Sequence, residues 1–183
     1  MTQQNGIREL GMRREPKGCV AVYAVRVLQG EVFMKVEDTP YLKHERAVVH
    51  VDAERFMRLW QKDPSPLHHE WAVGNEASWR ADLKFPKAVE GFSFGEVNPV
   101  PLASVFCEST APDNERTFLQ RLFGQSPSMY VGVTNGITRT IWLLSHGCKA
   151  FPVECNITGA LVLHQLAGAS AILPKTVEEL TKD

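Results

Sequence analysis

The sequence lacks three features that mark specialised protein classes. It has 20 Lys and Arg against 21 Asp and Glu, a net charge of -1, so it has no excess positive charge with which to coat nucleic acid. No apolar run approaches the roughly 18 to 20 residues of a membrane helix, and we expect no membrane insertion. The cysteines form no CxxC pair, and in a chain of this size they are expected to be reduced and mostly buried. These absences predict a soluble, cytoplasmic protein whose cysteines, Cys19, Cys107, Cys148 and Cys155, form no disulfide framework.

The apolar content is sufficient for one sizeable core. Hydrophobic residues make up 44% of the 183 residues, which allows folding without disulfides or metal ions. Residues 1–18 carry scattered charges with little periodicity, so we expect a mobile N-terminal arm there. Residues 19–183 are expected to form a single domain.

The first half of this domain begins with strand patterns. Two β-branched runs joined by a glycine-containing turn predict a β-hairpin over 19–37. A third run, 47–51, ends at Asp52, whose carboxylate can cap a following helix. Residues 63–100 mix Pro, Gly, His and Trp without a sustained period, so we expect long loops with a short helix or two. Such a stretch is a candidate lid or substrate wall.

The later elements alternate between strands and helices. We expect a strand over 102–107 and a helix that Asp113-Asn114 caps and Gly124 ends. The last third is the most regular part of the sequence. Its expected order is strand 129–134, turn Asn135-Gly136, helix 138–146, strand 150–155, helix 158–166 and a last helix opened by Pro174. Interleaved elements of this kind predict a mixed α+β fold.

The turn at Asn135-Gly136 has the composition of a phosphate-binding site. A helix start presents unpaired backbone N–H groups and the positive end of the helix dipole, and a glycine lets an anion approach the backbone. Arg139 adds a guanidinium that can bind a phosphate with two hydrogen bonds. The alternative is a plain turn with a solvent-facing arginine. The predicted phosphate-binding residues are Thr134, Asn135, Gly136, Thr138, Arg139 and Thr140.

The segment from Tyr130 to Cys155 resembles the signature of the ParB/sulfiredoxin superfamily. In that signature a strand leads into a G-x-x-R turn and a helix, followed by a glycine and a strand with an apolar-Pro-apolar start. The matching features here are Gly136, Arg139, Gly147 and Phe151-Pro152-Val153. The upstream segment from Gly95 to Leu102, GEVNPVPL, is similar to the superfamily's early Pro-rich element. The resemblance implies a ParB/sulfiredoxin-like compact domain with an N-terminal β-hairpin.

Two departures narrow the choice within that superfamily. Sulfiredoxins use a cysteine inside the turn as nucleophile, whereas this turn is Gly136-Ile137-Thr138-Arg139. Chromosome-partitioning ParB proteins usually carry adjacent arginines at the nucleotide loop, and here there is one. The length and the NPVPL context are most similar to the plasmid fertility inhibition factors. The sequence has no GxxxxGK[ST] motif, so any nucleotide binding is not of the P-loop kind.

The resemblance to the fertility inhibition factors implies a function and a cofactor. The resemblance implies a protein that binds and hydrolyses ATP, cleaves DNA, and blocks transfer of plasmid DNA or T-DNA through a type IV secretion system. Its partners would be that DNA and the coupling protein of the secretion channel. The alternative is an inhibitor without turnover that binds the coupling protein or exported effectors.

Cleavage of a phosphodiester usually requires carboxylates that hold Mg²⁺ beside a water molecule. Glu96 and Asn98, in the Pro-rich segment, and Glu108, just after the predicted strand, are the nearest candidates. The catalytic set predicted from the sequence is therefore Arg139, Glu96 and Glu108. The alternative is that these carboxylates are ordinary solvated residues.

A small basic strip is the candidate contact for a DNA backbone. Arg80 and Lys84 lie four residues apart, and Lys87 follows. A solvated helix face explains the same spacing. The four tryptophans could stack on bases, but aromatic residues at apolar helical positions are typical of a core.

Overall fold

The computed structural model describes residues 6–37, 45–65, 68–110 and 128–182. It is a mixed α+β fold, as the sequence predicts. Its strands form two sheets, in the orders β1-β2-β3-β5 and β7-β6-β8-β4-β9. The first sheet contains β1 (Ile7–Glu15), β2 (Gly18–Val27), β3 (Gly30–Glu37) and β5 (Val100–Pro101). The second contains β4 (Arg46–Asp52), β6 (Ala103–Ser109), β7 (Met129–Asn135), β8 (Ala150–Asn156) and β9 (Lys175–Thr176).

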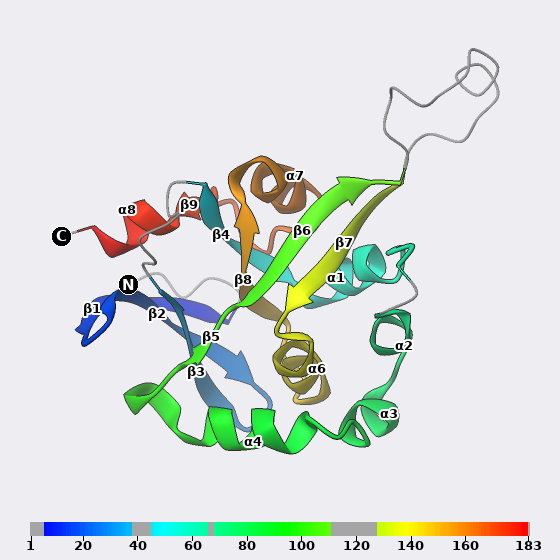
Figure 1. The fold of residues 1–183 in the computed structure, drawn as a ribbon, viewed down its shortest axis with the longest axis horizontal. Helices are drawn as coiled ribbons and strands as arrows, with labels where there is room; N and C mark the ends of the chain where they lie inside the picture. The colour runs from blue at the N-terminus through cyan, green and yellow to red at the C-terminus, as the bar shows by residue number, and fades with distance from the viewer. Residues whose placement is uncertain (1–5, 38–44, 66–67, 111–127, 183) are drawn as a thin grey trace, which may run out of the picture.

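The helices lie around these sheets (Figure 1). One group, together with a 3₁₀ turn, connects the two sheets in sequence, and another follows the strands of the second sheet. The first group is α1 (Ala53–Trp60), α2 (His69–Ala72), α3 (Glu76–Arg80), α4 (Phe85–Ser93) and η1 (Gly95–Val97). The second is α6 (Ile137–Ser145), α7 (Ile157–Ala167) and α8 (Val177–Thr181).

The predicted hairpin is confirmed, but the predicted N-terminal arm is wrong over most of its length. β2 and β3 pair antiparallel up to Val27 and Gly30. Residues 7–15 are β1, which pairs antiparallel with β2, and Ile7 is buried. The charges hid this strand because Arg8 and Arg13 form ion pairs at its surface with Glu31 and Glu15. Residues 1–5 lie outside the described residues.

The strand that ends at Asp52 continues directly into a helix, as predicted. The Asp52 carboxylate accepts a hydrogen bond from the backbone N–H of Arg55 at 2.9 Å, which caps α1. Phe56 and Trp60 are fully buried, and Phe56 packs edge-on against Phe151 of β8. The cap fixes where α1 starts, and the aromatic face fixes how it packs.

Residues 63–100 contain more helix than the sequence indicates. Besides α2 and α3, the nine-residue helix α4 and the turn η1 fill this stretch. The long helix was missed because Gly91 lies inside it. A Cβ at Gly91 would lie 3.1 Å from Cγ1 of Val100, so the glycine permits close packing that outweighs its low helix propensity. The helix predicted after Asp113-Asn114 lies outside the described residues.

The last third follows the predicted order of strand, turn, helix, strand and helix. The C-terminal helix is the exception, because Pro174 does not open it. Lys175 and Thr176 pair with β4 instead, and Thr176 caps α8 through a reciprocal pair of hydrogen bonds with Glu179.

One continuous hydrophobic core joins the two sheets into a compact domain. It includes Tyr23 and Met34 of the first sheet together with Val49, Phe151 and Leu163 of the second sheet and α7. Trp60, Trp79 and Trp142 belong to the same core, so they are not exposed stacking platforms. Among the residues that the structure describes, no helix is both long and apolar enough to cross a membrane.

Candidate functional site

A cleft of about 710 Å³ opens beside the turn at which β7 ends and α6 begins. This α4–α6 cleft is lined by one face of α4, by β5 and the residues before it, by the end of β3, and by residues 134–139. Its volume is in the range typical of small-molecule sites. The charged residues on its walls are Lys35, Glu37, Lys84, Lys87 and Arg139. Four cations thus face one carboxylate.

Gly136 is the N-cap of α6, and its backbone requires a glycine. Its φ is +90°, and α6 has no side chain that caps its first turn. A Cβ at Gly136 would lie 2.7 Å from Nη2 of Arg139 and 2.9 Å from Cα of Ala103. The first N–H groups of α6 therefore lie at the cleft without a capping side chain, where the helix dipole favours an anion.

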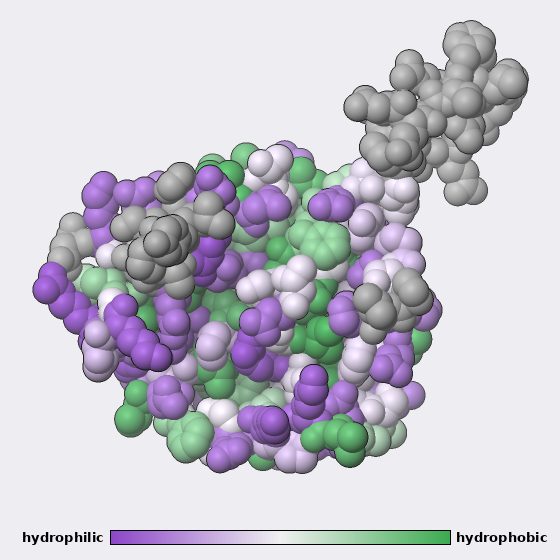
Figure 2. All heavy atoms as spheres, in the orientation of Figure 1, coloured by the Kyte–Doolittle hydropathy of each residue, from purple (hydrophilic) through white to green (hydrophobic). Residues whose placement is uncertain are grey.

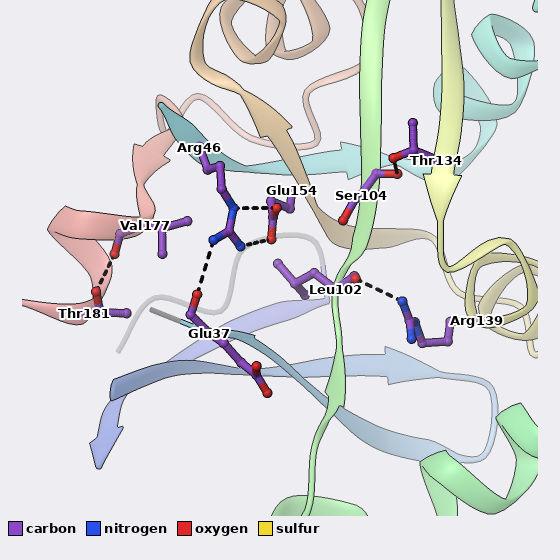
Figure 3. A network of polar contacts seen from close by, with 9 residues as sticks. All are labelled: Glu37, Arg46, Leu102, Ser104, Thr134, Arg139, Glu154, Val177 and Thr181. Carbon is purple, nitrogen blue, oxygen red and sulfur yellow. Dashed lines mark hydrogen bonds and ion pairs between the residues drawn. The ribbon is translucent and has the colours of Figure 1, made fainter. Parts of the chain in front are cut away.

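Arg139 lies on the first turn of α6 with donor capacity to spare. Its Nη2 donates a hydrogen bond to the carbonyl oxygen of Leu102 at 3.3 Å (Figure 3). Its Nε is buried and has no partner among the described residues. Burial lowers the pKa of the guanidinium, because desolvation penalises the charged form. No carboxylate of the described residues neutralises it, so an anion in the cleft would supply the missing partner.

Lys35 is a cleft residue that sequence reasoning missed. It is only 8% exposed, and its Nζ lies 2.7 Å from Oε2 of Glu15 and 3.3 Å from Oε1 of Glu37. Burial acts to lower the pKa of Lys35, but the hydrogen bonds that it donates to the two glutamates, with their negative charges, outweigh burial and raise the pKa. The signal in the sequence was a lysine inside the apolar run VFMKVE.

The predicted phosphate-binding residues are mostly brought together. Asn135, Thr134 and Thr138 line the cleft with Gly136 and Arg139. The hydroxyl of Thr134 donates to the carbonyl oxygen of Ser104 at 3.0 Å (Figure 3), so its oxygen is already oriented by β6.

Thr140 is a correction to the predicted set. It is fully buried, and its hydroxyl donates to the Gly136 carbonyl at 3.1 Å. The helical rotation between neighbouring residues of α6 turns position 140 into the core while Arg139 lines the cleft.

The predicted basic strip is divided between two places. Lys84 and Lys87 line the α4–α6 cleft. Arg80 lies on α3, where it pairs with Glu76 at 2.9 Å and stands over the ring of Phe85. Arg80 does not line the cleft. Because α3 ends at Arg80 and α4 begins at Phe85, the spacing expected along one continuous helix does not apply here.

The predicted metal carboxylates are not brought together. Glu96 is exposed on η1, and its backbone carbonyl accepts a hydrogen bond from Arg13 at 2.8 Å. Glu108 is exposed near the C-terminal end of β6, where its carboxylate accepts a hydrogen bond from Tyr130 at 3.4 Å. Neither lines the cleft, whereas Asn98 does. The described residues contain no group of three or more His, Cys, Asp or Glu placed to hold a metal ion, so Glu96 and Glu108 do not fit a shared Mg²⁺ site.

Phe94 and His68 are further cleft residues, neither of which the sequence assigned to the phosphate site. Phe94 is half exposed at the C-terminal end of α4. His68 lies at the start of α2, and its buried Nδ1 has no partner within the described ranges. Only the tertiary arrangement of α2 and α4 brings these two residues to the cleft.

Known proteins resemble this chain in sequence and in structure. The protein Osa of Shigella flexneri is 28% identical over 130 residues, which span 68% of this chain and 57% of that protein. The match therefore covers less than two thirds of Osa. The crystal structure of an oncogenic suppression activity protein, described as a plasmid fertility inhibition factor, was solved as a gold(I) cyanide derivative. It superposes with a TM-score of 0.71 at 23% identity, covering 96% of this chain and 81% of that one.

The family model of the plasmid fertility inhibition factors matches residues 48–168. This range contains α1, the whole helical stretch before β5, and the β7–α6 turn with Gly136 and Arg139. The match confirms the predicted relation to the plasmid fertility inhibition factors. The chain belongs to the plasmid fertility inhibition factor family.

Proposed function

We propose that this chain inhibits transfer of plasmid DNA or T-DNA through a type IV secretion system by binding and hydrolysing ATP in the α4–α6 cleft and cleaving DNA. The observation that carries the proposal is Arg139, a partly buried guanidinium without a carboxylate partner among the described residues, placed at an uncapped helix start. A phosphate is the ligand class that such a combination favours.

Each part of the cleft has a role in this proposal. The first N–H groups of α6 and the Arg139 guanidinium would bind phosphate oxygens, with Asn135 and Thr138 beside them. Lys84 and Lys87 add positive charge on the opposite wall. Because negative charge must be stabilised as a phosphate bond breaks, fixed cations at this place favour hydrolysis.

The proposed DNA contact uses the same cations. Lys84 and Lys87 are the members of the predicted basic strip that lie at the cleft, so a phosphodiester backbone would approach the same wall. We assign no step to Glu96 or Glu108, because they lie away from this wall, and none to Mg²⁺. The coupling protein of the secretion channel is the proposed protein partner in the cell.

The test compares wild type with Arg139→Ala and Arg139→Lys. Phosphate release from ATP and nicking of plasmid DNA are measured in the same tubes, with and without Mg²⁺, and transfer inhibition is measured in mating cells. Turnover in wild type, its loss in Arg139→Ala and partial recovery in Arg139→Lys are expected, because lysine keeps the charge but loses the two-point geometry. Arg58→Ala is the control, since Arg58 is an exposed residue of α1 paired with Glu54.

Two results would contradict the enzyme proposal. One is a folded wild type, checked by circular dichroism, that neither releases phosphate nor nicks DNA yet inhibits transfer. The other is an Arg139→Ala variant that inhibits transfer as well as wild type does. Either would favour the alternative, an inhibitor that binds the coupling protein or exported effectors without turnover.

A further inference from the structure

One face of α4 changes in chemistry along its length. The residues of α4 and its caps that line the cleft are spaced three or four apart, as on a single helix face. They are Lys84, Lys87, Ala88, Gly91 and Phe94. The cations stand at the N-terminal end and an aromatic ring stands at the C-terminal end. Phe94 follows Lys84 by ten positions, a rise of about 15 Å along a helix.

This face is held at a fixed angle to the turn. Phe92, next to Gly91 in α4, stacks on Trp142 of α6 with ring centroids 4.1 Å apart. Gly91 packs closely on Val100 of β5. These two contacts hold the backbone of α4 against α6 and β5, so they set the positions along the cleft from which Lys84, Lys87 and Phe94 extend.

Phe94 presents an accessible aromatic ring on a cleft wall that also carries apolar residues. Phe94 is 50% exposed, whereas Phe92 is 6% exposed. Pro99, Val100 and Pro101 line the cleft from the facing segment. Figure 2 shows apolar residues in green among hydrophilic ones along the lower edge of the molecule, where Figure 1 places α4. An accessible ring with apolar neighbours is a suitable surface for stacking a flat heterocycle.

We propose that Phe94 stacks on the base of the bound nucleotide while Arg139, Lys84 and Lys87 bind its phosphates. This inference rests on the proposed function, and it adds an orientation of the ligand along α4. The ligand class is then a nucleoside triphosphate and not a free polyphosphate. Stacking requires no hydrogen bond to the base, so Phe94 contributes affinity without selecting one base.

The test uses two probes to distinguish binding of the base from binding of the phosphates. Isothermal titration calorimetry measures the Kd of ATP and of inorganic tripolyphosphate for wild type, Phe94→Ala and Phe94→Trp. Phe94→Ala is expected to weaken ATP binding about 5- to 150-fold and to leave tripolyphosphate binding unchanged. Phe94→Trp is expected to bind ATP at least as tightly as wild type. The control is Val97→Ala, because Val97 is 89% exposed and does not line the cleft.

The possible failures are distinguishable. Equal ATP affinity in wild type and Phe94→Ala overturns the stacking role while leaving the phosphate site intact. An equal loss of ATP and tripolyphosphate affinity also overturns the stacking role, because the change then acts through the phosphates. A wild type that binds neither probe overturns the proposed function, and this inference with it.

Discussion

Gly136 and Arg139 are sterically coupled: a single added carbon on Gly136 would lie 2.7 Å from the guanidinium Nη2 of Arg139. The same carbon would lie 2.9 Å from the backbone of Ala103 at the start of β6. The glycine therefore does more than permit the turn. Its missing side chain leaves the space in which the guanidinium stands, and so links the backbone conformation to the candidate binding group.

Replacing Gly136 by alanine is expected to reduce both stability and ATP binding. The left-handed backbone alone costs about 1–2 kcal/mol for a residue with a Cβ, and the contact with Ala103 adds to it. Gly11→Ala is the matched control, because Gly11 has a φ of +96° with nothing within 4 Å of the added carbon. Urea unfolding of both variants measures the difference, and ATP titration shows whether Arg139 has moved. An equal loss of stability in the two variants would contradict the steric coupling.

The ion pair between Arg46 and Glu154 is expected to stabilise the second sheet. Arg46 on β4 makes two hydrogen bonds to the Glu154 carboxylate on β8 (Figure 3). Both side chains are less than a fifth exposed. Glu154→Gln should lower the free energy of unfolding by about 1–3 kcal/mol, because it removes the charge from a partly buried, two-point pair. The control is Glu54→Gln, in an exposed ion pair on α1, which should change the free energy of unfolding by less than about 0.5 kcal/mol. Similar losses of stability in the two variants would show that burial of the Arg46–Glu154 pair is unimportant.

Glu15 should contribute to loss of stability in acid. Hydrogen bonds from Lys35 and Arg13 hold the pKa of Glu15 below its ordinary value of 4.5. A carboxyl whose pKa is lower in the folded state stabilises the protein above the unfolded value and loses that effect as the pH falls through the folded value. The difference in unfolding free energy between wild type and Glu15→Gln should therefore be largest above about pH 5 and should shrink below pH 4.5. A difference that stays constant from pH 3 to 6 would contradict this account.

The cysteines should differ sharply in reactivity. Burial raises the pKa of Cys107 to about 11 and those of Cys148 and Cys155 to about 12, so almost no thiolate exists at pH 8. Cys19 is partly exposed. Iodoacetamide at pH 8 should label Cys19 first and the other three only after unfolding, which mass spectrometry of the digested protein can follow. Early labelling of Cys148 would show that the core opens near α6.

The sequence predicted the elements whose signals are local. Asp52 identified the start of α1, and the glycines at 136 and 147 bounded α6, because caps and turns depend on neighbouring residues. Charged residues in β1 concealed a strand, since Arg8 finds its partner, Glu31, on another strand, β3. Gly91 concealed α4 for a similar reason, because its packing against Val100 is not local.

The candidate site also has one part that local sequence signals predicted and another part that only packing decided. The sequence by itself determined the turn of residues 134–139, with its glycine and arginine, because helix-start geometry follows from adjacent residues. Only the tertiary structure decided what faces that turn. It brought Lys35, Lys84, Lys87 and Phe94 to the cleft and placed Glu96, Glu108, Arg80 and Thr140 elsewhere. The physical reason is that sequence spacing fixes a side chain's direction within one helix or strand, while the packing of separate elements decides which directions converge.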